Sequence, residues 1–322
     1  MSISSWVGIV PSVTFSFDRT IPPSVTLYVI GCVILRFTFV CVTLPPSRGS
    51  QAVEEMGVLL RRWLYYLRSI PVLLLGVRNW PQVVALFLGL PVRRPLTVTL
   101  RQSGLRFQVR SAMDVWVIKE TCLDRDYERY GARLQRGWTV FDIGAALGDF
   151  TLFAAQQVGE QGRVYAFEPF PESFALLVDN IKLNGALNVT AYPYAVAGKR
   201  GHLRLVAASE AVRNATAPGS GPNEVEAWSL EEALDRVERC DLMKVDCEGG
   251  EYDIFLQAGA AALGKVQAIC MEYHDGVTPY SHCDLVRSLE AHGFQVSVYP
   301  SRVQPAIGFL KAQRRAVERN HG

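Results

Sequence analysis

The stretch Thr139-Val-Phe-Asp-Ile-Gly144-Ala-Ala-Leu-Gly148-Asp149-Phe-Thr151 is the most informative part of this chain. It predicts a buried strand over residues 140–143 that carries Asp142, then a glycine turn, then the start of a helix. A second predicted strand, Arg163-Val-Tyr-Ala-Phe-Glu168-Pro169, also ends in an acid. In doubly wound sheets, ligands bind beyond the carboxyl ends of the strands, and an acid about twenty residues past the glycine turn holds ribose hydroxyls. The two strands therefore predict a site for an adenosine-bearing cofactor.

The composition of the turn favours S-adenosylmethionine over a dinucleotide. An NAD site typically has G-x-G-x-x-G, whose middle glycine admits the pyrophosphate, but here Ala146 stands in the middle and Asp149 replaces the last glycine. A carboxylate at a helix N-terminus repels a pyrophosphate. The sulfonium and ammonium of S-adenosylmethionine are positive, so Asp142, Asp149 and Glu168 are predicted to form an anionic cradle. The alternative is structural, with Asp149 as a helix N-cap and ordinary acids at the strand ends.

Length, charge and cysteine content exclude some classes of protein. The 322 residues can hold one large α/β domain plus accessory segments, and a net charge of +2 without a basic stripe argues against nucleic-acid binding. The 7 cysteines are odd in number and lack C-x-x-C spacing, and several lie in apolar runs (Cys240, Cys247, Cys270). They predict reduced, buried thiols in a cytosolic domain, without a disulfide framework or zinc site.

Residues 1–55 form an apolar segment whose role the sequence leaves open. The run 25–44 is just long enough to cross ~30 Å of hydrocarbon. Arg36 lies inside this run and would cost about 2.5–3.5 kcal/mol near the bilayer centre. The Val, Ile and Thr content favours strands in water, and no signal-peptide pattern is present. A membrane span, a strand-forming segment, and a spurious extension of a protein that begins at Met56 all stay open.

Residues 56–94 form a basic, apolar arm. Two short helices are predicted over 59–68 and 83–88, joined through Pro71 and Pro81, and every charged residue between Gly57 and Arg94 is an arginine. This composition is typical of an interfacial membrane helix; the alternative is an arm packed against the domain, or a dimer contact. Residues 95–135 form a small accessory region that starts with a predicted hairpin of strands 96–100 and 105–109.

The main domain is predicted over residues 136–322, where apolar strands alternate with helices. This pattern is typical of an α/β fold with a Rossmann-like, mostly parallel sheet, and the last two strands predict an antiparallel edge. The expected strands of this seven-stranded sheet cover residues 140–143, 163–167, 189–195, 242–245, 268–271, 294–299 and 306–310. The expected helices cover residues 150–158, 172–183, 230–237, 252–257 and 285–292.

A second motif, Asp241-Leu-Met-Lys244-Val-Asp246-Cys-Glu248-Gly249-Gly250-Glu251, repeats the pattern of a strand that ends in acids and turns on glycines. This strand is expected beside the first one, at the cleft where cofactor and substrate meet. Asp246 and Glu248 point to the same side if the strand continues. A buried acid there orients the cofactor or accepts a proton from a hydroxyl nucleophile; the alternative is that both acids cap the next helix.

A third strand end, Met271-Glu272-Tyr-His274-Asp275, places Glu272 and His274 on one side. Together with Asp246 and Glu248 they have the ligand types that hold a divalent cation, but we assign no metal and keep them as candidate catalytic groups. For His274 the alternative is a solvent-facing loop residue.

Four ordered motifs resemble the FkbM-type methyltransferase family, and the resemblance covers about residues 114–299. They are Asp142-Ile-Gly-Ala-Ala-Leu-Gly-Asp-Phe-Thr151, Tyr165-Ala-Phe-Glu-Pro169, Asn180-Ile-Lys-Leu-Asn-Gly185 and Lys244-Val-Asp-Cys-Glu-Gly249. The resemblance implies a class I methyltransferase sheet, S-adenosylmethionine as cofactor, and methyl transfer to a hydroxyl of a sugar, glycolipid or secondary metabolite. The chain departs from the family at Ala146, where asparagine is frequent, so a side-chain contact to the cofactor is lost there.

The expected reaction is in-line displacement, in which the protein supplies alignment and electrostatics. The cofactor assignments are Gly144 and Gly148 for close backbone approach, Ala146 in the turn, Glu168 with Pro169 at the ribose, Asp142 and Asp149 at the amino-acid end, and Asp246 beside the sulfonium. The candidate base is Asp246 or Glu248, with Glu272 and His274 ranked lower.

Two other classes of function remain as alternatives. One is an NAD-linked oxidoreductase on a similar sheet, and the other is a non-catalytic membrane-associated binding protein, suggested by the arginine-rich arm. We expect a cytoplasmic protein, with attachment to the cytoplasmic face of the membrane through the N-terminal region as a further expectation. The sequence leaves the methyl acceptor, metal dependence and oligomeric state open.

Overall fold

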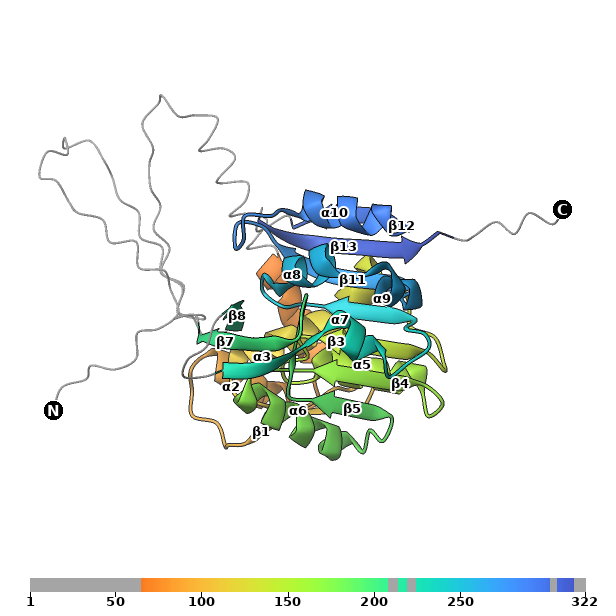
Figure 1. Cartoon of the computed structure of the whole chain (residues 1–322). Helices are drawn as coiled ribbons and strands as arrows, with labels where there is room; N and C mark the ends of the chain where they lie inside the picture. Colours follow the sequence, from red (N-terminus) through yellow and green to blue (C-terminus); the bar gives the residue numbers. More distant parts are fainter. Residues whose placement is uncertain (1–64, 208–213, 219–223, 302–305, 316–322) are drawn as a thin grey trace, which may run out of the picture.

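Seven strands form one sheet that runs through the protein (Figure 1). The computed structural model describes residues 65–207, 214–218, 224–301 and 306–315. The strands are β3 (Thr139–Ile143), β4 (Arg163–Phe167), β5 (Val189–Tyr192), β10 (Leu242–Val245), β11 (Ala268–His274), β12 (Phe294–Pro300) and β13 (Ile307–Arg314). Their order is β12-β13-β11-β10-β3-β4-β5, parallel from β11 to β5, with β13 antiparallel to both of its neighbours. The predicted seven-stranded, mostly parallel sheet is confirmed.

Helices cover both faces of this sheet because successive strand residues point to opposite sides. In β3, Val140 packs with Phe150 in one hydrophobic cluster, whereas Phe141 packs with Phe255 in another. The first face carries α5 (Asp149–Val158) and α6 (Pro171–Asn184). The second face carries α7 (Leu230–Leu234), α8 (Gly250–Gln257), α9 (Ala260–Lys265) and α10 (His282–Ala291).

The strand predicted over residues 189–195 is wrong in extent. Pro193 lacks the N–H that would continue the ladder, so β5 ends at Tyr192 and a new strand, β6 (Ala195–Ala197), starts after it. β6 belongs to a second sheet that was not predicted, with β7 (Gly201–Ala207), β8 (Asn214–Pro218) and β9 (Glu224–Ser229), in the order β6-β9-β7-β8.

The N-terminal part of the described chain packs against the first face. Residues 65–76 are helical, and α2 (Trp80–Phe87) follows with Pro81 in its first turn. The helix continues through Pro71, so the predicted join at that proline is wrong. The predicted hairpin is confirmed as β1 (Leu96–Thr99) with β2 (Arg106–Val109), followed by α3 (Ala112–Ile118), the π-helical turn η2 (Lys119–Asp124) and α4 (Asp126–Tyr130). The interpretations of residues 1–55, and part of the helix predicted over 59–68, lie outside the described residues.

Two asparagines of α6 attach the hairpin to the main domain. Asn180 is fully buried; its Oδ1 accepts from the N–H of Gln108 at 2.7 Å and its Nδ2 donates to the carbonyl of Leu147 at 2.9 Å. One turn later, Asn184 accepts from and donates to the backbone of Arg106, at 2.9 and 2.7 Å. These side chains pair with β2 as a neighbouring strand would. The accessory region therefore sits firmly on the domain, where α3, η2 and α4 form one wall of the site.

Candidate functional site

A cavity of about 1120 Å³ lies beyond the carboxyl ends of β3, β4, β10 and β11. Sites for drug-sized ligands typically measure about 300–1,000 Å³, so this one has room for a cofactor and an acceptor together. The predicted site residues that line it are Gly144, Ala146, Glu168, Pro169, Asp246, Glu248 and Glu272. The other predicted residues, Asp142, Gly148, Asp149 and His274, lie behind its surface.

The β3–β10 register places a buried lysine at the centre of the site. Lys244 lies directly opposite Asp142 in the parallel ladder, and its Nζ is 3.1 Å from Oδ1 of Asp142 and 4.0 Å from Oδ2 of Asp246. The ammonium also donates to the carbonyl of Gly144 at 2.7 Å. Burial opposes the charged form, but Asp142, Asp246 and Asp149 outweigh it and raise the pKa of Lys244. The sequence motif contained Lys244, yet its role was missed; a lysine in an otherwise apolar strand was the available signal.

Two acids of the predicted cradle bind protein groups instead of lining the cavity. Asp142 is fully buried beside Lys244 and accepts from the hydroxyl of Thr151 at 2.5 Å. Asp149 is the first residue of α5, and its Oδ2 accepts from the hydroxyl of Thr121 at 2.5 Å; burial raises the pKa of Asp149 to about 6. The predicted anionic cradle is therefore corrected: of its three acids, only Glu168 lines the cavity.

Glu168 joins the end of β4 to the glycine turn. Its Oε2 accepts from the N–H of Ala146 at 2.7 Å and its Oε1 from the N–H of Phe170 at 2.8 Å. Burial raises the pKa of Glu168 to about 7, although these two N–H groups favour the ionised form. A carboxylate has about four acceptor sites, so Glu168 retains acceptor capacity toward the cavity.

The backbone N–H groups of the turn are already used within the protein. The N–H groups of Gly144 and Ala145 both donate to the carbonyl of Phe167, and that of Gly148 donates to the carbonyl of Ala145. With the N–H of Ala146 on Glu168, four of the donors that would cradle a pyrophosphate in a dinucleotide site are occupied. The turn is built to hold a carboxylate of the protein.

Both glycines of the turn are required by close packing within the protein. Gly144 has φ of +78°, and a Cβ there would lie 1.9 Å from the carbonyl oxygen of Asp246. Gly148 has φ of +90°, and a Cβ would lie 2.6 Å from the side chain of Leu177 on α6. Gly148 lies away from the cavity, so its predicted role in cofactor approach is corrected to helix packing.

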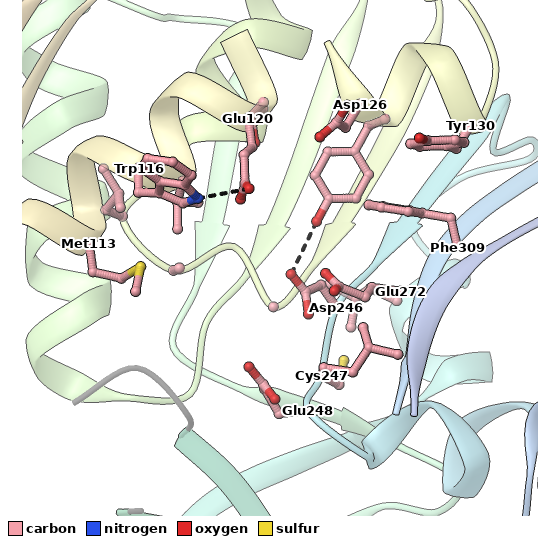
Figure 2. A pocket seen from close by; sticks show the side chains of 18 of the residues that line it. Met113, Trp116, Glu120, Asp126, Tyr130, Asp246, Cys247, Glu248, Glu272 and Phe309 are labelled. Carbon is pink, nitrogen blue, oxygen red and sulfur yellow. Dashed lines mark hydrogen bonds between the residues drawn. The ribbon is translucent and has the colours of Figure 1, made fainter. Parts of the chain in front are cut away.

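Three acids from β10 and β11 converge on the cavity (Figure 2). β10 ends at Val245 and Glu248 has φ of +50°, so the turn, rather than strand alternation, brings Asp246 and Glu248 to one side. The hydroxyl of Tyr127 donates to Oδ2 of Asp246 at 3.1 Å. Beside Asp246, burial and the charge of Asp246 raise the pKa of Glu272 to about 8.

His274 lies behind Glu248 and is only 4% exposed, which excludes the solvent-facing alternative. Its Nδ1 is 3.2 Å from the fully buried Glu251 of α8, and its Nε2 is 3.4 Å from Glu248. Burial opposes protonation, but the hydrogen bond to Glu251 and the charges of Asp246, Glu251 and Glu248 raise the pKa of His274 to about 9. His274 does not line the cavity as Glu272 does; it lies directly behind Glu248, which does.

The accessory region adds aromatic walls and acids that the motifs did not indicate. Trp116 and Tyr130 flank the cavity on opposite sides, with Glu120 and Asp126 between them (Figure 2). Tyr130 stacks on Phe309 with ring centroids 4.8 Å apart. The further lining residues of these walls are Tyr65, Tyr66, Asp124, Tyr127 and Tyr299. No motif includes them, because they come together only when α3, η2 and α4 pack over the sheet.

The strand order, with an antiparallel β13 inserted beside β11, and the acids at the carboxyl ends of β4 and β10 are those of the class I methyltransferase fold. Residues 142–296 match the methyltransferase FkbM domain. This part of the chain is therefore a methyltransferase FkbM domain, as the four sequence motifs predicted.

Two named relatives have similar sequences. The 31-O-demethyl-FK506 methyltransferase FkbM of Streptomyces tacrolimicus is 27% identical over 62% of this chain and 89% of its own length. The hexuronic acid methyltransferase AglP of Haloferax volcanii is 26% identical over 63% of this chain and 82% of its own length. Among solved structures, the methyltransferase FkbM of Methylobacillus flagellatus is 13% identical with a TM-score of 0.40, covering 62% of this chain and 54% of that one.

Proposed function

We propose that this protein transfers a methyl group from S-adenosylmethionine to a hydroxyl of a sugar or glycolipid, with a hydroxylated secondary metabolite as the other acceptor class. The observation that carries the proposal is the row of carboxylates, Glu168, Asp246, Glu248 and Glu272, along the carboxyl edge of the parallel sheet. In-line displacement forms the new O–CH₃ bond as the C–S bond breaks and its electron pair stays on the sulfur.

The residues of the turn suit the adenosine of this cofactor. Glu168 faces the cavity with spare acceptor capacity for ribose hydroxyls, and Pro169 follows it at the rim. Occupation of the turn's N–H groups by protein acceptors disfavours the dinucleotide alternative. The ion pair of Asp142 with Lys244 joins the ends of β3 and β10, and Asp246, at 4.0 Å from Nζ of Lys244, reaches the cavity.

Asp246 is the proposed base toward the acceptor hydroxyl, and Glu272 is its neighbour. Tyr127 and Lys244 both contact Oδ2 of Asp246, which fixes the orientation of the carboxylate. The acceptor O–H proton passes to this pair of acids as the oxygen attacks the methyl carbon. Glu248 stands at the edge of the same group.

Aromatic rings and carboxylates together support a sugar as the acceptor. Carboxylates accept hydrogen bonds from hydroxyls, and aromatic faces offer rigid apolar platforms. In this cavity, Glu120 and Asp126 lie between the rings of Trp116 and Tyr130. The name of one relative, a hexuronic acid methyltransferase, agrees with a sugar acceptor, and that of the other, a 31-O-demethyl-FK506 methyltransferase, agrees with methyl transfer to oxygen. The proposal is tested by incubating the protein with methyl-labelled S-adenosylmethionine and uronic acid glycosides, then a metabolite extract; absence of any methylated product contradicts it.

Replacement of Glu168 by alanine weakens S-adenosylmethionine binding by about 10- to 100-fold, because hydrogen bonds to a charged group are lost. The ionised form of Glu168 accepts the ribose hydroxyls, so in the parent protein affinity rises with pH through the pKa of about 7. Isothermal titration at several pH values measures both effects. Glu172→Ala, in the exposed first turn of α6, is the matched control and leaves affinity unchanged. Unchanged affinity of the Glu168 variant removes that residue from the site.

The arm suggests that the acceptor is reached at a membrane surface. Leu67, Ile70 and Leu75 of the helix over 65–76 are 54%, 42% and 76% exposed. Between residues 65 and 113 the sequence contains no acid and no lysine, and its charged residues are Arg68, Arg78, Arg93, Arg94, Arg101, Arg106 and Arg110.

No helix within the described ranges combines the length and apolarity needed to cross a bilayer. Tyr65, Tyr66 and Arg68 of the same helix line the cavity. We therefore propose that the arm binds the anionic cytoplasmic leaflet and presents the cavity to a glycolipid.

Vesicle flotation tests this surface. The protein is expected to float with vesicles that contain phosphatidylglycerol, less with neutral vesicles, and less at high salt, because exposed charge attraction is screened. Leu75→Glu reduces binding, whereas Leu187→Glu, at a leucine that is 99% exposed on the loop after α6, does not. Equal flotation of both variants, or none by the parent protein, contradicts membrane binding through the arm.

A further inference from the structure

We infer that Asp246, Glu248 and His274 hold one divalent cation, of the Mg²⁺ or Mn²⁺ class, at the acceptor side of the cavity. One ligand atom from each of these residues lies within 4.8 Å of the other two, so a single ion can contact all three. The residues come from two neighbouring strand ends, β10 and β11. The role given to the ion rests on the proposed methyl transfer, whereas its binding does not.

The surroundings of His274 are those of a metal-ligating histidine. Such a histidine almost always directs its second ring nitrogen at a carboxylate or carbonyl, which fixes the ring. Here Nδ1 faces Glu251 at 3.2 Å, while Nε2 points toward Glu248. Glu251 is itself held by the backbone N–H groups of His274 and Gly249, at 2.8 and 2.9 Å. The ring is therefore oriented by a fully buried carboxylate that no step of the proposed reaction uses.

The two carboxylates complete a donor set for a hard cation. The contacts of Tyr127 and Lys244 both fall on Oδ2 of Asp246, so Oδ1 takes neither of them. Glu248 adopts a left-handed backbone conformation, with φ of +50°, which is uncommon for a residue with a side chain. That strain turns the residue out of the β10 line and into the cavity. The two carboxylates suit Mn²⁺ or Mg²⁺, and the imidazole favours Mn²⁺ of the two, with the remaining positions open to water or to an acceptor oxygen.

A cation in this position would act on the acceptor rather than on the cofactor. Coordination of the acceptor hydroxyl lowers its pKa by stabilising the alkoxide. The proton then passes to Glu272, which lies beside the three ligands, while the oxygen forms its bond to the methyl carbon and the C–S electron pair remains on the sulfur. With the ion bound, Glu272 is the member of the acid pair that accepts the proton, and Asp246 is a ligand that keeps the ion next to it.

The test measures binding of Mn²⁺ to the full chain in the absence of cofactor and acceptor. Electron paramagnetic resonance reports the concentration of Mn²⁺ that stays free. We expect one ion per chain, displaced by excess Mg²⁺. Glu248→Gln retains the size of the side chain, and it weakens binding by about 10- to 100-fold. His274→Gln has a similar effect, with circular dichroism and the melting temperature checking that it folds. Asp235→Asn, at a surface carboxylate whose side chain is 77% exposed, is the matched control and binds as the parent does.

Absence of Mn²⁺ binding by the parent protein, or equal binding by a folded Glu248→Gln variant, overturns the site and leaves His274 and Glu248 as an ion pair only. The outcome is separable from that of the proposed function. Methylated product from a metal-free protein that binds no Mn²⁺ rejects the cation and keeps the methyltransferase. Mn²⁺ binding without product from any acceptor keeps the site and rejects its role in methyl transfer.

Discussion

Replacement of Asp246 by asparagine is expected to lower kcat for methyl transfer by about 10²- to 10⁴-fold, the range typical for loss of a group that takes part in acid–base catalysis. The carboxylate lies in the cavity between Lys244 and Glu272 and is oriented by the hydroxyl of Tyr127. Asparagine keeps the size of the side chain and an oxygen for Tyr127, so the loss is of charge and basicity. Affinity for S-adenosylmethionine is expected to change little, because Glu168 provides the proposed ribose contact.

The measurement is formation of S-adenosylhomocysteine with a verified acceptor, together with isothermal titration of the cofactor. Asp179→Asn, on the exposed side of α6, is the matched control. The pH profile adds a second readout, since the charge of Asp246 helps to raise the pKa of Glu272 to about 8. The activity of the parent protein should rise with pH through this value. In Asp246→Asn this rise in activity should occur at lower pH, because the charge that raises the pKa of Glu272 is removed. Full turnover by the variant removes Asp246 from the chemistry.

Replacement of Lys244 by methionine is expected to destabilise the fold by about 3–5 kcal/mol, because loss of one partner leaves a buried charge uncompensated. Asp142 is fully buried, and Lys244 is its ion-pair partner at 3.1 Å. The same change removes the donor to the carbonyl of Gly144, so the glycine turn is released as well. Chemical denaturation monitored by circular dichroism measures the change in the free energy of unfolding.

Two comparisons separate this explanation from a general packing defect. Lys265→Met removes a surface pair with Asp235, at 3.6 Å, and should cost less than about 1 kcal/mol. The double variant Lys244→Met with Asp142→Leu removes both charges and should recover part of the stability, because an apolar pair is often as stable as a buried ion pair. If the double variant is less stable than Lys244→Met alone, uncompensated charge is not the cause.

Several elements were predictable because their signals are local. Short apolar runs that alternate with amphipathic helical segments identified every strand of the main sheet. Glycines close to an acidic residue marked the ends of β3 and β10. The error over residues 189–195 has a local cause too, since Pro193 already signals the end of a ladder. The second sheet was not predicted, because the segment between β5 and β10 was not interpreted as strands.

The site was predicted less completely than the fold. Glu168, Asp246 and Glu272 line the cavity, as expected because the strand ends of a parallel sheet meet at one edge. Asp142 and Asp149 have the same sequence signature, yet both are satisfied inside the protein by Lys244 and Thr121. An acid at a strand end looks the same in the sequence whether its partner is a ligand or another side chain.

By itself, the sequence determined the strands of the main sheet, the edge of that sheet that carries the site, and the acid beside the glycine turn, because these follow from the hydrophobic period of the chain and from backbone chemistry. Only the tertiary structure decided that Lys244 faces Asp142, that Glu251 orients His274, and that Trp116 and Tyr130 wall the cavity. Lys244 and Asp142 lie 102 residues apart in the chain. Such contacts depend on strand register and on how helices pack, which no local pattern specifies.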